Sequence, residues 1–450
     1  MTDTTQLIPN NLAVTSDLDY RLKPSAPRSR SYRASILPTN KNTFNPTDTC
    51  IMYIPGGRRN TYLDCSQSYI RMTLKNTDGT GAFRLDNNAN CVINRLDVFH
   101  GSNLLETIQT YNILSAYILD MQLSTSQKLA FANVYGFDVD GDRQGTNFTA
   151  GAQRTFCLPI FSGVVGVLND KMLPIGLLAD DIRLEFTFES LASAVVQSAT
   201  AGVLSILDFQ LQLTIVELSD EGENMVRSNY QYPQMPLYLH GNSWRHYVSQ
   251  LPAATSGGYS TLVPARFASL KQLALIPRRN TETSSATSYS LSSRVNPNIA
   301  QYWWRIGSAI IPSKAVYLES AGNTGGYGEA YAELLKSWHA LHAISSSTAL
   351  TSEIYNVADA TVTNCPQIAV GTAANQTSNS YLNGFVIAQE LESFAQRSDV
   401  LLSGMNTLSS QVFFEAQLGT TLGAAPYTLD FFAWYDHIMV IDQGIISIKY

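Results

Sequence analysis

The stretch Arg95-Leu96-Asp97-Val98-Phe99 decides the fold, because a passage of the same design recurs in the second half of the chain. It is predicted to be a β-strand, and Gly101, Asn103 and a helical stretch at 111–123 follow it. The later passage runs Ala315-Val316-Tyr317-Leu318-Glu319, then Gly322 and Asn323, then a helical stretch at 331–344. We therefore expect one β-rich unit, present twice.

The correspondence continues downstream in the same order. The matching pairs are 156–160 with 385–388, 182–188 with 411–415, and the long closing strands 208–216 with 430–441. The offset is roughly 220 to 230 residues in all three places, a regularity that favours an internal repeat. Residue identity between the halves is slight, so the repeat lies in pattern and order.

Short strands separated by turns, with an occasional helix in a long crossover, are typical of a jelly-roll sandwich. Tyr69-Ile70-Arg71-Met72-Thr73-Leu74 alternates and stops at the turn signal Asn76-Thr77-Asp78-Gly79. The helix at 111–123 is expected to place one apolar stripe against the sheets: Ile113, Leu114, Tyr117, Ile118 and Met121. The predicted fold class is all-β, with two tandem eight-stranded jelly-roll sandwiches and short helices in the crossover loops.

Four segments are expected along the chain. Residues 1–46 are polar, contain several prolines and lack sustained periodicity, which indicates an extended N-terminal arm. The first jelly roll is placed at 47–218 and the second at 241–450. Between them, residues 219–240 read as a linker that carries Pro233 and Pro236.

Composition favours a protein whose outer faces meet neighbours. Charged residues make up 14% of the 450 residues, against about 25% in an average chain. Depletion of charge is typical of interface cores, although β-rich extracellular and lectin-like chains share this composition. The net charge of −7 argues against a protein that coats nucleic acid with its whole surface.

The cysteines are few and odd in number, which favours small reduced core residues over a disulfide framework. They are Cys50, Cys65, Cys91, Cys157 and Cys365. The start of the chain lacks the order of a signal peptide, and the longest apolar stretch, 158–179, is interrupted by Asn169-Asp170-Lys171 and Pro174. We expect a soluble protein made in a reducing compartment.

One acidic loop resembles a calcium loop in part. Asp138, Asp140 and Asp142 stand at the first, third and fifth places. A loop of the EF-hand kind also needs Gly at the sixth place and Glu at the twelfth. Arg143 and Thr149 stand there instead, so a solvated loop is the favoured interpretation and cation binding the weaker one.

Other candidate chemistry does not assemble in the sequence. His339 and His342 lie three apart on a predicted helix, but no third metal ligand is indicated nearby. Gly56-Gly57-Arg58-Arg59 lacks the ending and context of a phosphate loop and is expected to be a turn between strands. We find no nucleophile with a partner base and no metal cluster of the cupin kind. The prediction is a protein that is not an enzyme and has no cofactor.

The N-terminal arm carries a run of positive charges with no acid among them, consisting of Arg21, Lys23, Arg28, Arg30 and Arg33. These residues are expected to contact neighbouring subunits, a membrane or nucleic acid; a solvated terminus is the alternative. In the pair Trp303-Trp304, one ring should face the core and the other outward, because side chains alternate along a strand.

The chain resembles the double jelly-roll major capsid proteins of double-stranded DNA viruses, especially those of polinton-like viruses, adintoviruses and virophages. Three stretches carry the resemblance: Leu37-Pro38-Thr39-Asn40 through Phe44-Asn45-Pro46 to Tyr62-Leu63-Asp64 and Ser68-Tyr69-Ile70; Leu96-Asp97-Val98-Phe99-His100-Gly101-Ser102-Asn103; and Leu158-Pro159-Ile160 through Gly166-Val167-Leu168-Asn169-Asp170-Lys171 to Leu173-Pro174-Ile175-Gly176-Leu177 and Ile182-Arg183-Leu184-Glu185. The second half matches only in its order of elements.

The resemblance implies a homotrimer whose six jelly rolls make a pseudo-hexagonal capsomer, tiled into an icosahedral shell. It also implies contacts with neighbouring capsomers, penton and minor capsid proteins, and a place in the virion after synthesis and assembly inside the host cell. The loops 256–260, 281–293 and 322–328 are the candidates for the outward-projecting part of such a capsomer. The alternative is a spike or lectin-like double sandwich that binds glycans through its long loops. A metal-dependent jelly-roll enzyme ranks third.

Overall fold

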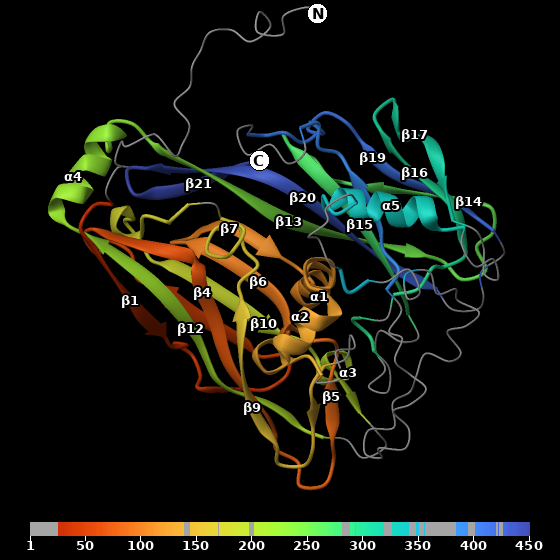
Figure 1. The fold of residues 1–450 in the computed structure, drawn as a ribbon, viewed down its shortest axis with the longest axis horizontal. Coiled ribbons are helices and arrows are strands. Elements are labelled where there is room, and N and C mark those ends of the chain that lie inside the picture. Colours follow the sequence, from red (N-terminus) through yellow and green to blue (C-terminus); the bar gives the residue numbers. More distant parts are fainter. Residues whose placement is uncertain are drawn as a thin grey trace, which may run out of the picture.

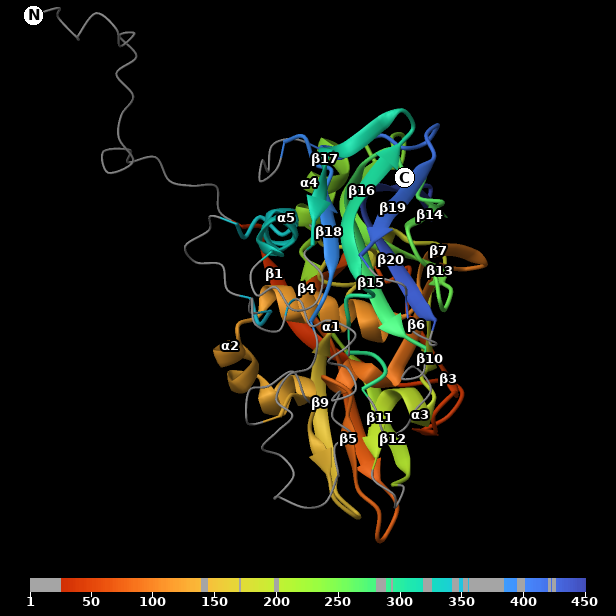
Figure 2. The same ribbon diagram turned by 90° about the vertical axis from the view of Figure 1, so that its right-hand side faces the viewer.

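Two β-rich units lie side by side in the computed structural model (Figures 1 and 2). In Figure 1 the first occupies the lower left, coloured red to yellow-green, and the second the upper right, coloured green to blue. The structure describes residues 26–138, 145–169, 171–197, 202–280, 289–292, 294–318, 326–341, 348–350, 355, 384–394, 401–419, 422 and 426–450.

The first unit is a sandwich of two antiparallel sheets, each with a path of four strands, and one of them carries a fifth strand. One sheet has the order β1 (Ser29–Ile36), β12 (Leu204–Leu218), β4 (Thr61–Asn76) and β9 (Gln153–Pro159), with β2 (Thr43–Phe44) also on β12. The other has the order β3 (Thr49–Ile54), β10 (Ile182–Phe188), β6 (Ile93–His100) and β7 (Asn103–Ile108). A small third sheet consists of β11 (Val195–Gln197), β5 (Phe83–Leu85) and β8 (Asn147–Phe148).

The second unit repeats this scheme strand for strand. Its first sheet has the order β13 (Leu237–Leu251), β20 (Tyr427–Asp442), β15 (Leu270–Arg279) and β18 (Ile387–Glu390), with β21 (Ile445–Lys449) on β20. Its second has the order β14 (Gly258–Val263), β19 (Val412–Leu418), β16 (Ile299–Ile306) and β17 (Ala309–Tyr317). The predicted repeat of an eight-stranded jelly roll is confirmed.

Alternation of side chains explains why these segments form half-buried strands. In β10, Ile182, Leu184, Phe186 and Phe188 are buried while the residues between them are partly exposed. The corresponding strand β19 shows the same alternation. Because side chains of a strand point to opposite faces in turn, one face of each strand packs into the core of its sandwich.

The strand Arg95–Phe99, however, corresponds to a different strand from the one expected. It lies in β6, whose counterpart is β16, whereas the run from Ala315 lies mainly in β17. Each strand pair turns at a glycine with positive φ, Gly101 (58°) and Gly307 (59°). The expected match is therefore wrong by one strand, because Gly322 and Asn323 follow the run from Ala315 and resemble in sequence the turn after Arg95–Phe99.

The N-terminal segment also differs from the expectation. Ser29–Ile36 was expected in an extended arm but forms strand β1, which pairs antiparallel with β12 from Ser29 opposite Leu218 to Ile36 opposite Leu211. Tyr32 and Ala34 pack against the core of the sandwich. The first jelly roll has eight strands only with β1 included. The segment 219–240, expected as a linker, holds helix α4 (Asp220–Asn229) and the start of β13.

Helices occupy the crossover that follows β7 and β17. They are α1 (Tyr111–Gln122), α2 (Thr125–Ala130) and, in the second unit, α5 (Gly328–Ser337). The short helix α3 (Leu191–Ala194) precedes β11. Two 3-10 helices span Ala89–Val92 and Ile175–Leu177, and a short π-helix spans Ala132–Gly136. In Figure 2, α1, α2 and α5 lie on one side of the sheets. Within the described residues, no helix has the length and apolar character to cross a membrane.

Helix α1 is buried on almost all sides, although the sequence predicted one apolar stripe. Eleven of its twelve residues are buried, including Asn112, Ser115 and Asp120. A helix covered all round must contact structure on every face. In α1 the second contact surface is the other jelly roll, so this helix lies between the two sandwiches (Figure 1).

Candidate functional site

The junction between the two jelly rolls is the most elaborate polar region that the structure describes. Tyr117 of α1 stands at its centre. Its hydroxyl accepts hydrogen bonds from Gln272 Nε2 at 2.8 Å and from Trp338 Nε1 at 2.7 Å, both in the second sandwich. The edge of its ring also faces Trp244, with centroids 6.2 Å apart. One side chain of the first unit is thus held by three residues of the second.

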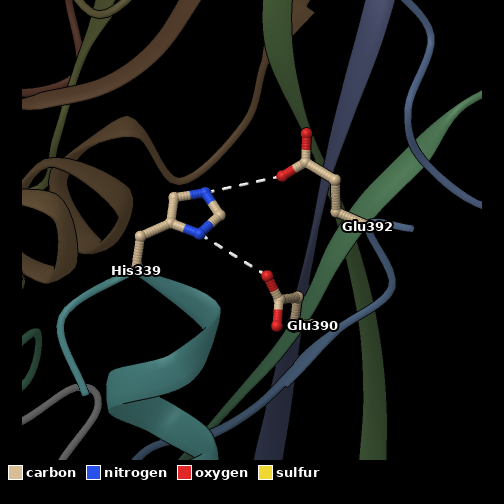
Figure 3. A group of neighbouring side chains, drawn as sticks. All are labelled: His339, Glu390 and Glu392. Atoms are coloured by element: carbon tan, nitrogen blue, oxygen red, sulfur yellow. Dashed lines mark ion pairs between the residues drawn. The ribbon is translucent and has the colours of Figure 1, made fainter. Parts of the chain in front are cut away.

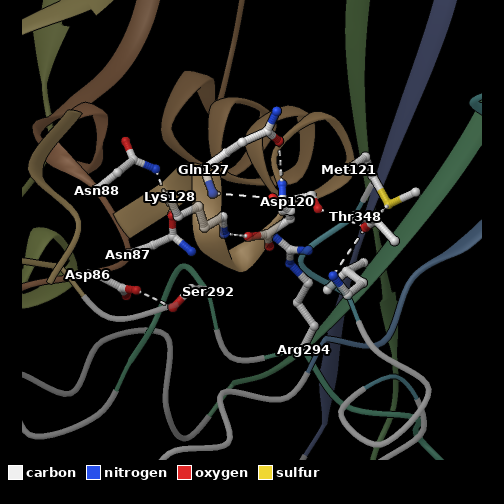
Figure 4. Close-up of polar contacts among 12 residues, drawn as sticks. Asp86, Asn87, Asn88, Asp120, Met121, Gln127, Lys128, Ser292, Arg294 and Thr348 are labelled. Atoms are coloured by element: carbon white, nitrogen blue, oxygen red, sulfur yellow. Dashed lines mark hydrogen bonds and ion pairs between the residues drawn. The ribbon is translucent and has the colours of Figure 1, made fainter. Parts of the chain in front are cut away.

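A buried group of charges lies around Asp120, which follows Tyr117 by three residues in α1 (Figure 4). Asp120 of α1 forms an ion pair with Lys128 of α2 and, at 3.1 Å, with Arg294 of the second unit. The side chains of all three are fully buried. Taking charges out of water costs several kcal/mol per ion, so each depends on its partners. These charges fix one arrangement of the two units.

Two more carboxyl groups of the first unit accept hydrogen bonds from the second. Asp86 accepts from the backbone N–H of Leu291 at 2.7 Å and from the hydroxyl of Ser292, as Figure 4 shows for the latter. Burial raises the pKa of Asp86 to about 6. Glu106 accepts from Ser243 across the junction, and burial raises its pKa as well.

The backbones of the two units also approach closely. The N–H of Asn242 donates to the carbonyl oxygen of Leu168 at 3.1 Å, and that of Ala179 donates to Gly444 at 3.0 Å. Gly163 leaves no room for a side chain, because an added Cβ would overlap the carbonyl oxygen of Asn242. Contacts so close and so widely spread hold the two jelly rolls in a fixed relation.

The junction also encloses an apolar pocket of about 200 Å³. Its lining comes from both units and consists of Ile118, Gln122, Leu168, Trp244, Trp338, His339 and Trp434. The three tryptophan rings have centroids no more than 6.1 Å apart. Burial of these large apolar rings stabilises the junction, which also contains the polar network described above.

The positive charges expected to make contacts through the arm are only partly described. Arg21 and Lys23 lie outside the described residues. Arg30 forms an exposed ion pair with Glu217 at 2.8 Å. Arg33 donates to Gln212 at 2.8 Å and to the hydroxyl of Tyr69 at 3.0 Å.

The fifth residue of this set, Arg28, meets the start of α4. Its carbonyl oxygen accepts from the N–H of Ser219 at 2.9 Å. The described part of the arm is therefore bound along the first sandwich, through Arg28 near α4 and through Arg30 and Arg33 on β1.

Of the acidic loop, only Asp138 is described; Asp140 and Asp142 lie outside the described residues. Asp138 forms a partly buried ion pair with Arg84 at 2.6 Å. This carboxylate therefore has an arginine partner from β5.

His339 is brought together with two carboxylates that the sequence did not connect with it (Figure 3). Its Nδ1 lies 3.5 Å from Glu390, and its Nε2 lies 3.4 Å from Glu392. The sequence indicated no third ligand near this histidine, and the structure places these two carboxylates beside it. His342 lies outside the described residues.

The two carboxyl groups of this cluster differ in acidity. Burial alone would raise the pKa of Glu392, but hydrogen bonds from His339 and Ser403 and the charge of Lys271 lower it to about 2. Burial raises the pKa of Glu390, and the charge of His339 only partly opposes this. Glu390 therefore holds its negative charge with less compensation.

Several smaller predictions are confirmed. Cys50, Cys65, Cys91 and Cys157 are free thiols, of which the first three are buried, while Cys365 lies outside the described residues. The Trp304 ring is fully buried, and that of Trp303 is partly exposed and donates to Glu415 at 2.6 Å. The Gly56-Gly57 segment connects β3 to β4, as expected of a turn.

These features define the fold class. Two jelly rolls of the same strand order, joined through a buried polar junction, form a double jelly roll, a fold that this chain shares with solved viral major capsid proteins. The chain is similar to VP54 of PBCV-1, solved by crystallography and fitted into a reconstruction of the virophage Sputnik, with a TM-score of 0.63, 10% identity and coverage of 96% of this chain and 98% of that one.

Two virophage structures give similar results. The crystal structure of the mavirus major capsid protein matches with a TM-score of 0.52, 10% identity and coverage of 100% of this chain and 95% of that one. A chain of the Sputnik virophage, solved by cryo-EM, matches with a TM-score of 0.52, 13% identity and coverage of 98% and 93%. No protein-family model and no curated protein matches the sequence.

Proposed function

We propose that this chain is the major capsid protein of a double-stranded DNA virus. The observation that carries the proposal is the double jelly roll itself, shared over nearly the full length with capsid proteins of PBCV-1 and mavirus. The junction supports a structural role, because its buried charges hold two similar sandwiches side by side as one building block.

The proposed assembly is a homotrimer with six jelly rolls around its axis. Closed rotational symmetry is the usual arrangement of soluble homo-oligomers. Three copies of a unit that contains two similar sandwiches produce a near-hexagonal outline, and such outlines tile a surface. The pseudo-hexagonal capsomers would then form an icosahedral shell, with penton and minor capsid proteins at the positions that the trimers do not fill.

In this proposal the protein is structural, without catalysis, and resides in the virion shell after assembly inside the host cell. The positive charges of Arg21 and Lys23 meet a neighbouring capsomer, an internal membrane or packaged DNA. This contact role is supported by the run of five basic residues without an acid, because clustered positive charge favours phosphate or acidic partners.

The test begins with the purified full-length chain. Size-exclusion chromatography with light scattering is expected to give a trimer, and negative-stain images at high concentration are expected to show sheets with hexagonal order. A monomer that forms no lattice would overturn the capsid function. A small oligomer whose melting temperature rises with sugars would instead support glycan recognition.

The arm is tested separately, with Arg21→Gln and Lys23→Gln combined. The variant is expected to remain trimeric but to lose lattice formation or DNA retention in a salt-dependent manner. Arg30→Gln is the matched control, because Arg30 already pairs with Glu217 within the same chain. Equal behaviour of the two variants would remove the contact role of Arg21 and Lys23.

A further inference from the structure

We propose that His339, Glu390 and Glu392 form a binding site for a divalent transition-metal ion of the zinc type. One ligand atom from each residue lies within 4.8 Å of the others. An imidazole nitrogen and carboxylate oxygens are ligands that zinc uses in proteins, commonly three from the protein with one position left open. This site does not depend on the capsid function proposed above.

The backbone explains why these side chains converge. Leu391 continues the pairing of β18, since its N–H donates to Lys271 at 2.8 Å, and its side chain is buried. Glu390 and Glu392 therefore point together to the opposite side, as alternating residues of an extended chain do. His339 follows the C-cap residue Trp338 of α5 and itself has a left-handed backbone, with φ 55°. This backbone turns its side chain toward the two carboxylates.

Both ring nitrogens of His339 have a carboxylate in front of them (Figure 3). An ion bound to one nitrogen would lie beside the carboxylate that faces it. The second carboxylate reaches the same ion by rotation of its side chain. All three side chains are half-buried, so part of their hydration is already removed.

The charges around the cluster also favour a cation. Lys271 lies 3.1 Å from Glu392 and 3.6 Å from Asp436, and Lys336 lies 3.7 Å from Glu333 and 4.0 Å from Glu390. These four carboxylates outnumber the two ammonium groups. A divalent ion would balance the excess of negative charge.

The ion would connect the end of α5 to β18, the edge strand of its sheet. It would also lie next to the tryptophan pocket, because His339 lines that pocket together with Trp244, Trp338 and Trp434. Three of the five tryptophans of the chain are therefore close to the proposed ion. Their fluorescence offers a readout that does not require any activity.

The experiment titrates ZnCl2 into the chelator-treated full-length protein by calorimetry. One zinc ion per chain is expected, and His339→Asn should weaken its binding at least tenfold. Asparagine is chosen because it tolerates the left-handed backbone of this position. The matched control is His240→Asn, since His240 also faces a carboxylate, Asp436 at 3.2 Å, but lies outside the cluster.

Two further measurements keep the proposal falsifiable. CoCl2 is expected to quench tryptophan fluorescence in the unaltered protein and in His240→Asn, but much less in His339→Asn. If His339→Asn fails to fold by circular dichroism, Glu390→Gln takes its place with the same expected loss. Equal zinc affinity in the unaltered and substituted proteins, or no binding to the unaltered protein, would overturn the site.

Discussion

Arg294 of the second jelly roll lies 3.1 Å from Asp120 of the first, and both side chains are fully buried. Lys128 reaches the same carboxylate from α2. A buried ion pair adds little net stability compared with apolar residues, but removal of one partner leaves an uncompensated charge. The junction therefore depends on all three residues at once, and it selects one placement of the two units.

Asp120→Asn is expected to lower the free energy of unfolding by about 3–5 kcal/mol, because Lys128 and Arg294 would lose their negative partner in a dry environment. Urea denaturation of the purified protein measures this change. Arg30→Gln is the control: its pair with Glu217 is 70% exposed on the arginine side, so its loss should change the free energy of unfolding far less than Asp120→Asn does. Similar losses for the two variants would contradict a special role of the buried charges.

Asp86→Asn is expected to change how stability depends on pH. Burial raises the pKa of Asp86 to about 6 in the folded protein, whereas an unfolded aspartate titrates near 3.9. The folded state thus binds the proton more tightly. The contribution of the Asp86 carboxyl group to the free energy of unfolding is therefore fully present below about pH 4, and it is lost as pH rises through about 6.

Comparing the unaltered protein with Asp86→Asn isolates this group from the other carboxylates. The difference in unfolding free energy should shift against the unaltered protein by about 3 kcal/mol between pH 4 and pH 7. Denaturation series at several pH values measure it. A difference that stays constant over this range would show that Asp86 is not held in its protonated form.

The sequence predicted the architecture because strand alternation and turn residues recur in both halves. It could not assign every strand to its counterpart, since β16 and β17 both contain short apolar runs and only the turn at Gly307 separates them. Strand β1 was missed because its flanking prolines and serines resemble a flexible arm. Its inward residues Tyr32, Ala34 and Ile36 carried a weak alternation signal.

The junction and the His339 cluster could not be predicted from local sequence patterns, for a different reason. Asp120 was a visible signal, as the one acid in a largely apolar helix, but its partner Arg294 is distant in sequence. Glu390 and Glu392 flank buried Leu391, which indicates one shared face, yet nothing local connects them with His339. Contacts of this kind follow from packing of the two units.

Thiol labelling is expected to distinguish the described cysteines. Burial raises the pKa of Cys50 and Cys65 to about 12, and it raises the pKa of Cys91 well above its usual value. Because the thiolate is the reactive form, these three should resist alkylation in the native protein at pH 8 and react after unfolding. Mass spectrometry of labelled peptides measures the order in which the cysteines react. Rapid native labelling of any of the three would contradict their place in the core.

Gly163→Ala is expected to destabilise the junction without touching a charge. A Cβ at this position would overlap the carbonyl oxygen of Asn242 and the ring of His437, both in the second unit. Overpacking of this kind costs about 1–3 kcal/mol, because backbone atoms have to shift. Gly79→Ala is the matched control, since a Cβ there meets no atom within 4 Å. It should be neutral or stabilise by up to about 1 kcal/mol, through reduced freedom of the unfolded chain. Thermal unfolding measures the stability of both variants. A loss of stability in Gly163→Ala no greater than in Gly79→Ala would show that the two jelly rolls are not packed this tightly.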